Sequence, residues 1–148
     1  MAKNNVFITE EYVDEDVDVE KLEKILQEML DYLKLKNVEV SVLLVDNKEI
    51  KKLNEEWRGK DKPTDVLSFP INEEAPYGCK LLGDIVISVP YAKEHAKEFG
   101  NTFQEEMVRL LAHGLLHLLG YDHERSEEDA KIMFQKEKEL ISAVKDKI

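Results

Sequence analysis

Three histidines near the C-terminal end of the chain limit the folds that it can adopt more than any other feature. They lie in the run His113-Gly-Leu-Leu-His117-Leu-Leu-Gly120-Tyr-Asp-His123. Residues four apart stand one above the other on an α-helix, so His113 and His117 can face one ion. Glycine readily adopts the left-handed conformation that ends a helix, so Gly120 can bring His123 back to the same ion. The run predicts a helix that ends at a metal site.

The composition of this site favours zinc. Neutral imidazole is a preferred zinc ligand, and three protein ligands leave the fourth tetrahedral position open, as in catalytic sites. The alternative is a set of ordinary core histidines, because the leucines of the run indicate a largely buried helix. We favour one zinc ion per chain, bound by His113, His117 and His123, because the chain has only four histidines and three of them share this run.

The spacing is also that of the metzincin proteases, H-E-x-x-H-x-x-G-x-x-H, with one departure. The glutamate that serves those enzymes as general base is replaced by Gly114, and glycine cannot move a proton. A zinc ion held by three neutral imidazoles keeps its full charge and can lower the pKa of bound water towards about 7. The sequence therefore indicates a hydrolytic site that depends on the metal itself or on a base from elsewhere in the chain.

Length and composition bound the remaining possibilities. A chain of 148 residues predicts a single domain, residues 1–148. Its first twenty residues resemble neither a signal peptide nor a membrane span, so we expect a soluble, cytoplasmic protein without a membrane partner. The net charge of −11 opposes a general affinity for nucleic acid. The charge is uneven, however, because residues 48–62 contain six lysines and arginines against four acids.

Apolar periodicity predicts a mixed order of strands and helices. Strands are expected at residues 5–9, 38–45, 66–71 and 84–89, and helices at 18–35, 46–59, 90–100, 102–119 and 126–144. The connection over 72–80 is expected to be a loop or hairpin turn. It is too short for a crossover helix, so the last two strands should be antiparallel. We expect an α+β fold, a small mixed four-stranded sheet packed by helices, with the histidine helix in the centre.

Three stretches together resemble the YbeY family of bacterial endoribonucleases. They are NEEWRGKDKPTDVLSFP at residues 54–70, GDIVIS at 83–88, and the histidine run that ends at His123. The resemblance covers most of the chain in order. It implies a zincin-like domain with a central metal-binding helix, zinc bound by the three histidines, and a functional arginine at Arg58. It also implies cleavage of single-stranded RNA in small-subunit rRNA 3′-end maturation, a part in ribosome quality control, and the ribosome or its proteins as partners, without DNA.

The resemblance gives the basic stretch a function. A guanidinium group matches phosphate in a planar two-point geometry, so Arg58 beside an open zinc is the expected catalytic residue. Lys60 and Lys62 are weaker candidates for neighbouring phosphates, because lysines in loops are commonly only solvated.

Other polar residues of the matching motifs have simpler explanations. Asp65, Ser68 and Asp84 are short side chains beside turns or strand ends, where they commonly bind nearby backbone. Asp122 is a candidate to orient a neighbouring histidine ligand. His95 is expected to be a surface or boundary residue.

Two alternatives of other classes stay open beside the zinc-dependent endoribonuclease. One is a ribosome assembly or binding factor that keeps the zinc for stability, which the acidic composition makes credible. The other is a metzincin-like metalloprotease, which the histidine spacing favours and Gly114 opposes.

Overall fold

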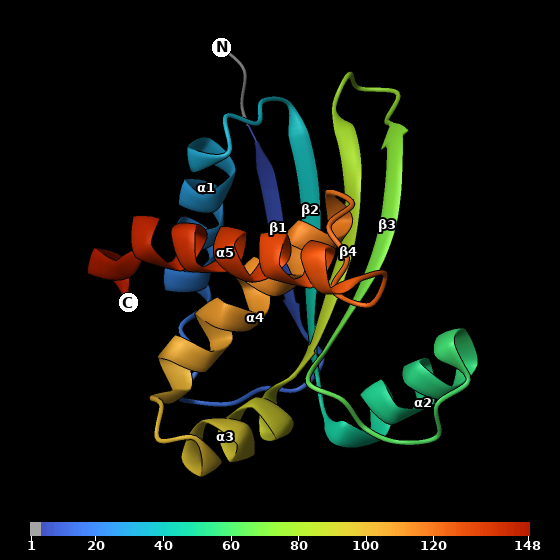
Figure 1. The fold of residues 1–148 in the computed structure, drawn as a ribbon, viewed down its shortest axis with the longest axis vertical. Helices are drawn as coiled ribbons and strands as arrows, with labels where there is room; N and C mark the ends of the chain where they lie inside the picture. The colour runs from blue at the N-terminus through green and yellow to red at the C-terminus, as the bar shows by residue number, and fades with distance from the viewer. Residues whose placement is uncertain (1–3) are drawn as a thin grey trace.

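The computed structural model describes residues 4–148 and shows an α+β architecture around one four-stranded sheet (Figure 1). The strands are β1 (Asn5–Glu10), β2 (Val38–Val45), β3 (Val66–Glu74) and β4 (Lys80–Ser88), in the order β1-β2-β4-β3. Neighbouring strands among β1, β2 and β4 pair in parallel, and β3 runs antiparallel to β4 at the edge. The expected mixed sheet and its antiparallel last pair are confirmed. The single domain over 1–148 stays a prediction, and its residues 1–3 lie outside the described residues.

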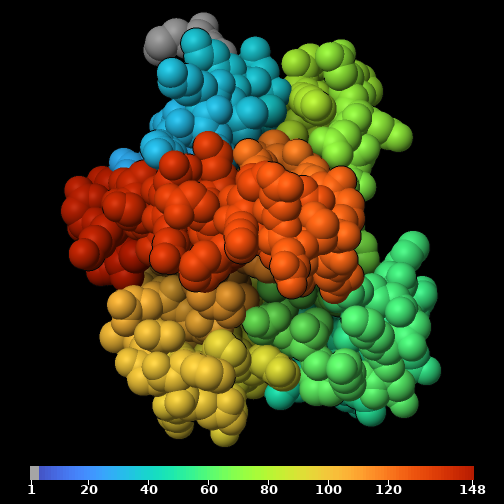
Figure 2. Space-filling view, in the orientation of Figure 1, coloured from blue at the N-terminus to red at the C-terminus, as the bar shows by residue number. Residues whose placement is uncertain are grey.

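Within residues 4–148, five α-helices pack around the sheet: α1 (Val19–Tyr32), α2 (Asn47–Arg58), α3 (Val89–Glu98), α4 (Phe103–Leu118) and α5 (Glu127–Ala143). Figure 1 shows α4 and α5 crossing in front of the strands, with α2 near the lower ends of the strands. In the same orientation, α5 forms part of a red and orange band across the middle of the molecule (Figure 2). No helix within residues 4–148 combines the length and the apolarity needed to span a bilayer.

The two faces of the sheet are covered unequally. In β2, alternate residues such as Val40, Val42 and Leu44 are buried in the main core, which they share with leucines of α1 and α4. Their neighbours Ser41 and Leu43 point to the other face and are only half-buried. A smaller cluster on that second face joins Ile50 of α2 to residues of β2, β3 and β4. The main core therefore lies between the sheet and the helix that carries the histidines.

Both ends of α4 form as the sequence predicts. At the N-terminus, the Thr102 hydroxyl accepts the Glu105 N–H at 3.0 Å, and the Glu105 carboxylate accepts the Thr102 N–H at 2.9 Å. At the C-terminus, Gly120 has a φ of 98° and donates to the carbonyl of His117, while Tyr121 donates to that of Leu116. Gly120 thus ends the helix and reverses the chain.

Helix α1 ends three residues before the expected Leu35. The N–H of Leu35 reaches back to the carbonyl of Leu30 at 3.0 Å, and Lys34 adopts a left-handed φ of 60°. This is the closure usually made by glycine, formed here by lysine. Because Leu33 and Leu35 continue the helical spacing of apolar residues, the sequence gives no sign of this end.

The connection over 72–80, expected to be a loop or hairpin turn, is a hairpin whose strands run further than expected. Strand β3 continues to Glu74 and β4 starts at Lys80, so the two strands extend into a longer hairpin. Their register shifts between Pro70 and Glu73, where Asn72 has a φ of 53°. Proline cannot donate to the ladder, and the left-handed residue breaks the alternation, so the pattern of a strand is lost in the sequence.

Gly114 sets the distance between α4 and the sheet. A Cβ at this position would lie 2.7 Å from Cγ2 of Ile85, a branched side chain buried in the core. The same contact shows why the metzincin glutamate has no room here, because the side chain at position 114 would meet β4.

We expect Gly114→Ala to lower the free energy of unfolding by about 1–3 kcal/mol, as overpacking of a close contact does. Urea denaturation followed by circular dichroism measures it. In an unhindered helix the same change stabilises by about 1 kcal/mol. A more stable variant would therefore contradict the close contact.

Candidate metal centre and its cleft

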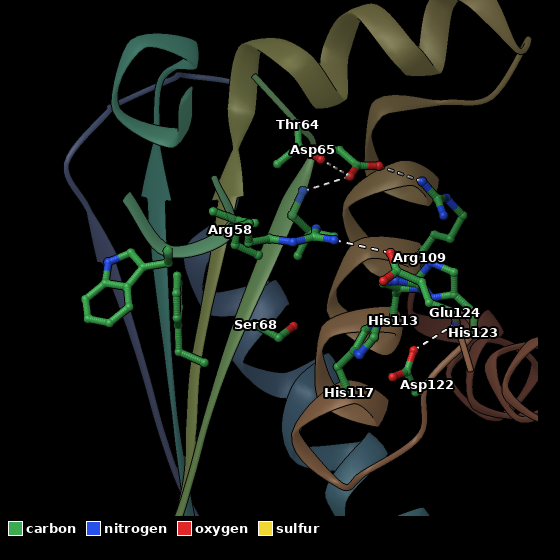
Figure 3. A pocket seen from close by; sticks show the side chains of 14 residues that line it. Arg58, Thr64, Asp65, Ser68, Arg109, His113, His117, Asp122, His123 and Glu124 are labelled. Atoms are coloured by element: carbon green, nitrogen blue, oxygen red, sulfur yellow. Dashed lines mark hydrogen bonds and ion pairs between the residues drawn. The ribbon is translucent and has the colours of Figure 1, made fainter. Parts of the chain in front are cut away.

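The three histidines of the run converge at the C-terminal end of α4 (Figure 3). Ring centroids are separated by 4.8 Å for His113 and His117, 5.3 Å for His113 and His123, and 5.4 Å for His117 and His123. One ring nitrogen from each lies within 4.8 Å of the others. The helical spacing and the turn at Gly120 thus form one group of donors that can hold a metal ion.

The state of these rings fits a metal ion. Burial lowers the pKa of His117 below its ordinary value, and the nearby His113 and His123 lower it further, so the ring is held in the neutral form that ligates metals. Nδ1 of His113 is buried without a hydrogen-bond partner among the described residues. It lies 3.4 Å from a carboxylate oxygen of Glu137 on α5, which leaves Nε2 free for an ion.

The histidines form one wall of an open cleft of about 580 Å³. The cleft lies between α4 and the edge strand β3, and Trp57 and Arg58 at the end of α2 also line it (Figure 3). Its lining residues are Trp57, Arg58, Thr64, Asp65, Val66, Leu67, Ser68, Phe69, Arg109, His113, His117, Asp122, His123 and Glu124.

Arg58 faces the histidines from the other side of this cleft (Figure 3). It is the last residue of α2, and Gly59, with a φ of 69°, ends the helix directly after it. Its Nη2 lies 3.2 Å from Oε1 of Glu124, and the same oxygen lies 3.8 Å from Nε2 of His123. The structure thus brings all four predicted site residues to one cleft. Lys60 is not among the residues that line it, nor is Lys62.

The cleft is also lined by a second arginine, Arg109, which the sequence did not predict as a site residue. Arg109 lies one turn before His113 on α4, and its Nε and Nη2 donate to Glu106 at 3.0 and 2.8 Å. Nη2 also lies 3.3 Å from Asp65. Glu106 has no exposed side-chain surface, and one of its oxygens lies 2.9 Å from Nδ1 of His95. The available signal was the three-residue spacing of Glu106 and Arg109, but an acid in the first turn of a helix reads as an ordinary exposed residue.

Two of the three short polar residues of the motifs, Ser68 and Asp65, bind backbone as expected. The Ser68 hydroxyl donates to the carbonyl of Gly114 at 3.3 Å, and Asp65 accepts the N–H of Val66 at 2.8 Å. Asp122 accepts the N–H of Glu124 at 2.8 Å, which lowers the pKa of its carboxyl. It therefore shapes the loop that carries His123, and the carboxylate beside Nδ1 of His113 comes from Glu137 of α5.

Glu137 is expected to orient His113. Replacing it with alanine should weaken metal binding by about ten- to a hundredfold, the usual cost of losing a carboxylate behind a ligating histidine. Calorimetric titration of metal-free protein with zinc measures it. Glu139→Ala is the matched control, because this residue lies on the same helix and pairs with Lys136. Equal affinities of the two variants would show that Glu137 does not support the site.

Comparisons with known proteins show which family the chain resembles. A family model described as Endoribonuclease YbeY matches residues 7–145. A protein of that name from Sulfurihydrogenibium sp. (strain YO3AOP1) is 55% identical over 132 residues, which span 89% of this chain and 87% of the relative. Another from Persephonella marina is 48% identical over 143 residues, which span 96% of this chain and 94% of the relative.

A solved structure supports the fold as well. The solution structure of TM1509 from Thermotoga maritima matches with a TM-score of 0.65 and 36% sequence identity. The match spans 96% of this chain and 89% of the other. Fold, motifs and relatives lead to the same assignment, and the chain belongs to the YbeY family.

Proposed function

We propose that this protein is a zinc-dependent endoribonuclease that cleaves single-stranded RNA. The observation that carries the proposal is the cleft in which three clustered imidazoles face a guanidinium group. One zinc ion per chain is bound by His113, His117 and His123, and Arg58 is the catalytic residue. The relatives named Endoribonuclease YbeY support the reaction class.

The division of labour follows from the chemistry of each group. When bound, the zinc supplies Lewis-acid activation of an oxygen nucleophile and neutralises charge near the scissile phosphate. Arg58 binds that phosphate through two parallel N–H donors and stabilises the negative charge that develops on it. In the structure the same guanidinium pairs with Glu124, so an incoming phosphate takes the place of this carboxylate.

The cellular part of the proposal rests on the family. We place the protein in the cytoplasm as a single domain, acting in maturation of the 3′ end of small-subunit rRNA and in ribosome quality control. Its partners are then single-stranded precursor RNA and the ribosome or ribosomal proteins, without membrane or DNA.

The decisive experiment is product analysis with purified, zinc-loaded protein and a single-stranded RNA. Cleavage at internal positions of the RNA supports the proposal. A terminal 2′,3′-cyclic phosphate would report attack by the ribose 2′-hydroxyl, whereas a linear phosphate would report attack by water.

An unfolded protein substrate tests the metalloprotease alternative, and metal-dependent peptide cleavage at a comparable rate would reverse the ranking of the two hydrolase functions. Gly114, pressed against Ile85, leaves no base at the metzincin position.

Arg58→Ala is expected to reduce RNA cleavage by about a hundredfold or more, because it removes a donor that acts on transition-state charge. Unfolding stability should change by less than about 0.5 kcal/mol, since the side chain is partly exposed and its ion pair lies at the surface. Arg58→Lys should recover only part of the rate, because lysine lacks the two-point geometry.

Steady-state kinetics on a labelled single-stranded RNA measure these rates, and metal analysis checks that the zinc content is unchanged. Lys24→Ala serves as the control, because this exposed lysine lies on α1, away from the cleft. Normal cleavage by zinc-loaded Arg58→Ala would remove Arg58 from the mechanism.

Removal of the metal distinguishes a zinc-dependent enzyme from an assembly factor that needs zinc only for its stability. The main core consists of apolar side chains and does not include the histidines, so metal-free protein should keep its fold. We expect a chelator to abolish RNA cleavage, with recovery on adding zinc, while the far-ultraviolet circular dichroism spectrum stays the same. Loss of the folded spectrum together with the metal would favour a structural zinc.

A further inference from the structure

A second groove lies on the opposite face of the edge strand from the histidines. It measures about 680 Å³ and is mostly apolar, with Leu43, Val86 and Pro70 among its lining residues. Trp57, Ser68 and Phe69 line both this groove and the metal cleft, so the two hollows adjoin each other at β3 and the end of α2.

The shared wall is an aromatic pair. The rings of Trp57 and Phe69 meet edge to face, with centroids 6.0 Å apart. Trp57 is 65% exposed, although tryptophan has the largest of the apolar side chains. Trp57 directly precedes Arg58 at the end of α2. It is therefore next in sequence to the residue whose guanidinium group faces the histidines. An exposed indole beside a group that can bind phosphate offers a surface on which a nucleobase can stack.

The charges of the two hollows differ. The metal cleft is lined by two guanidinium groups, those of Arg58 and Arg109, and by the carboxylates of Asp65, Asp122 and Glu124. The groove has no cation among its described lining residues, and its single charged group is Asp84. Burial raises the pKa of Asp84, and no cation lies against it to offset this. Only the cleft therefore has guanidinium donors for a phosphate, whereas the groove offers mainly apolar surface.

We propose that the groove binds a nucleobase of single-stranded RNA, stacked on Trp57, while an adjoining phosphate lies at Arg58. The proposal deepens the proposed function and rests on it. A base has an uncharged π-face that every nucleotide shares, so stacking is tolerant of sequence. The same helix and the loop after it add positive charge from Lys52, Lys60 and Lys62, none of which forms an ion pair within residues 4–148. Exposed aromatic surface beside basic residues is the usual combination in single-strand binding.

Intrinsic fluorescence tests the contact directly, because Trp57 is the only tryptophan of the chain. Addition of a short single-stranded RNA to zinc-loaded protein, read within seconds, should quench the emission. An RNA of equal length whose central residues lack bases keeps the phosphates and should quench much less. Equal quenching by both RNAs, or none by either while the RNA is cleaved, would overturn the nucleobase site.

Substitution gives the second test. Trp57→Leu keeps an apolar side chain but loses the π-face, and we expect KM for single-stranded RNA to rise by about five- to a hundredfold, with a smaller change in kcat. Trp57→Phe should restore much of the affinity. Tyr77→Leu is the matched control, since this aromatic residue is 66% exposed and lines neither hollow.

The outcomes separate the two proposals. An unchanged KM for Trp57→Leu, with normal cleavage, would assign the groove to another occupant such as a protein segment and leave the nuclease intact. Failure of the wild-type protein to cleave any RNA, with zinc bound, would instead overturn the proposed function. A higher KM for intact RNA, combined with an unchanged KM for the RNA that lacks bases, would establish that Trp57 acts through the base.

Discussion

The close approach of α4 to β4 is the constraint on which the site depends. Gly114 lets the helix backbone pack against Ile85, so the helix turns its neighbouring residues, His113 and His117, away from the sheet and into the cleft. Any larger residue at 114 would push the helix outward and move both imidazoles together. Gly114, which stands where the metzincin proteases have their catalytic glutamate, is therefore also the residue that allows this packing.

A charge cluster around the buried Glu106 links the walls of the cleft to one another. Glu106 has no exposed side-chain surface and lies between Arg109 of its own helix and His95 of α3, while Arg109 also reaches Asp65 at the start of β3. A buried carboxylate that loses its partner is strongly destabilising, commonly by about 3–5 kcal/mol. The cluster thus favours the single arrangement in which α3, α4 and β3 meet, and this arrangement holds the distance between the histidines and the opposite wall.

The parts of the site that were predictable are those encoded within a few residues. The helical spacing of His113 and His117, the turn at Gly120 and the capping box of α4 depend only on local geometry, and all three form. The position of Glu137 depends on how α5 packs against α4, and the burial of Glu106, which holds the Arg109 side chain, depends on how α3 packs there. No periodicity records such packing. Likewise, the end of α1 and the length of the β3–β4 hairpin are set by left-handed residues other than glycine, which carry no clear signal in the sequence.

The net charge of −11 bears on selectivity. An acidic surface gives little of the non-specific attraction that holds basic proteins on any nucleic acid, so binding depends on a few local contacts. Under the roles proposed here, Arg58 takes phosphate and Trp57 takes a base from the same strand. A duplex offers the phosphate but keeps its bases stacked, and unstacking one costs a few kcal/mol. A site that needs both contacts therefore discriminates against double strands without reading any sequence.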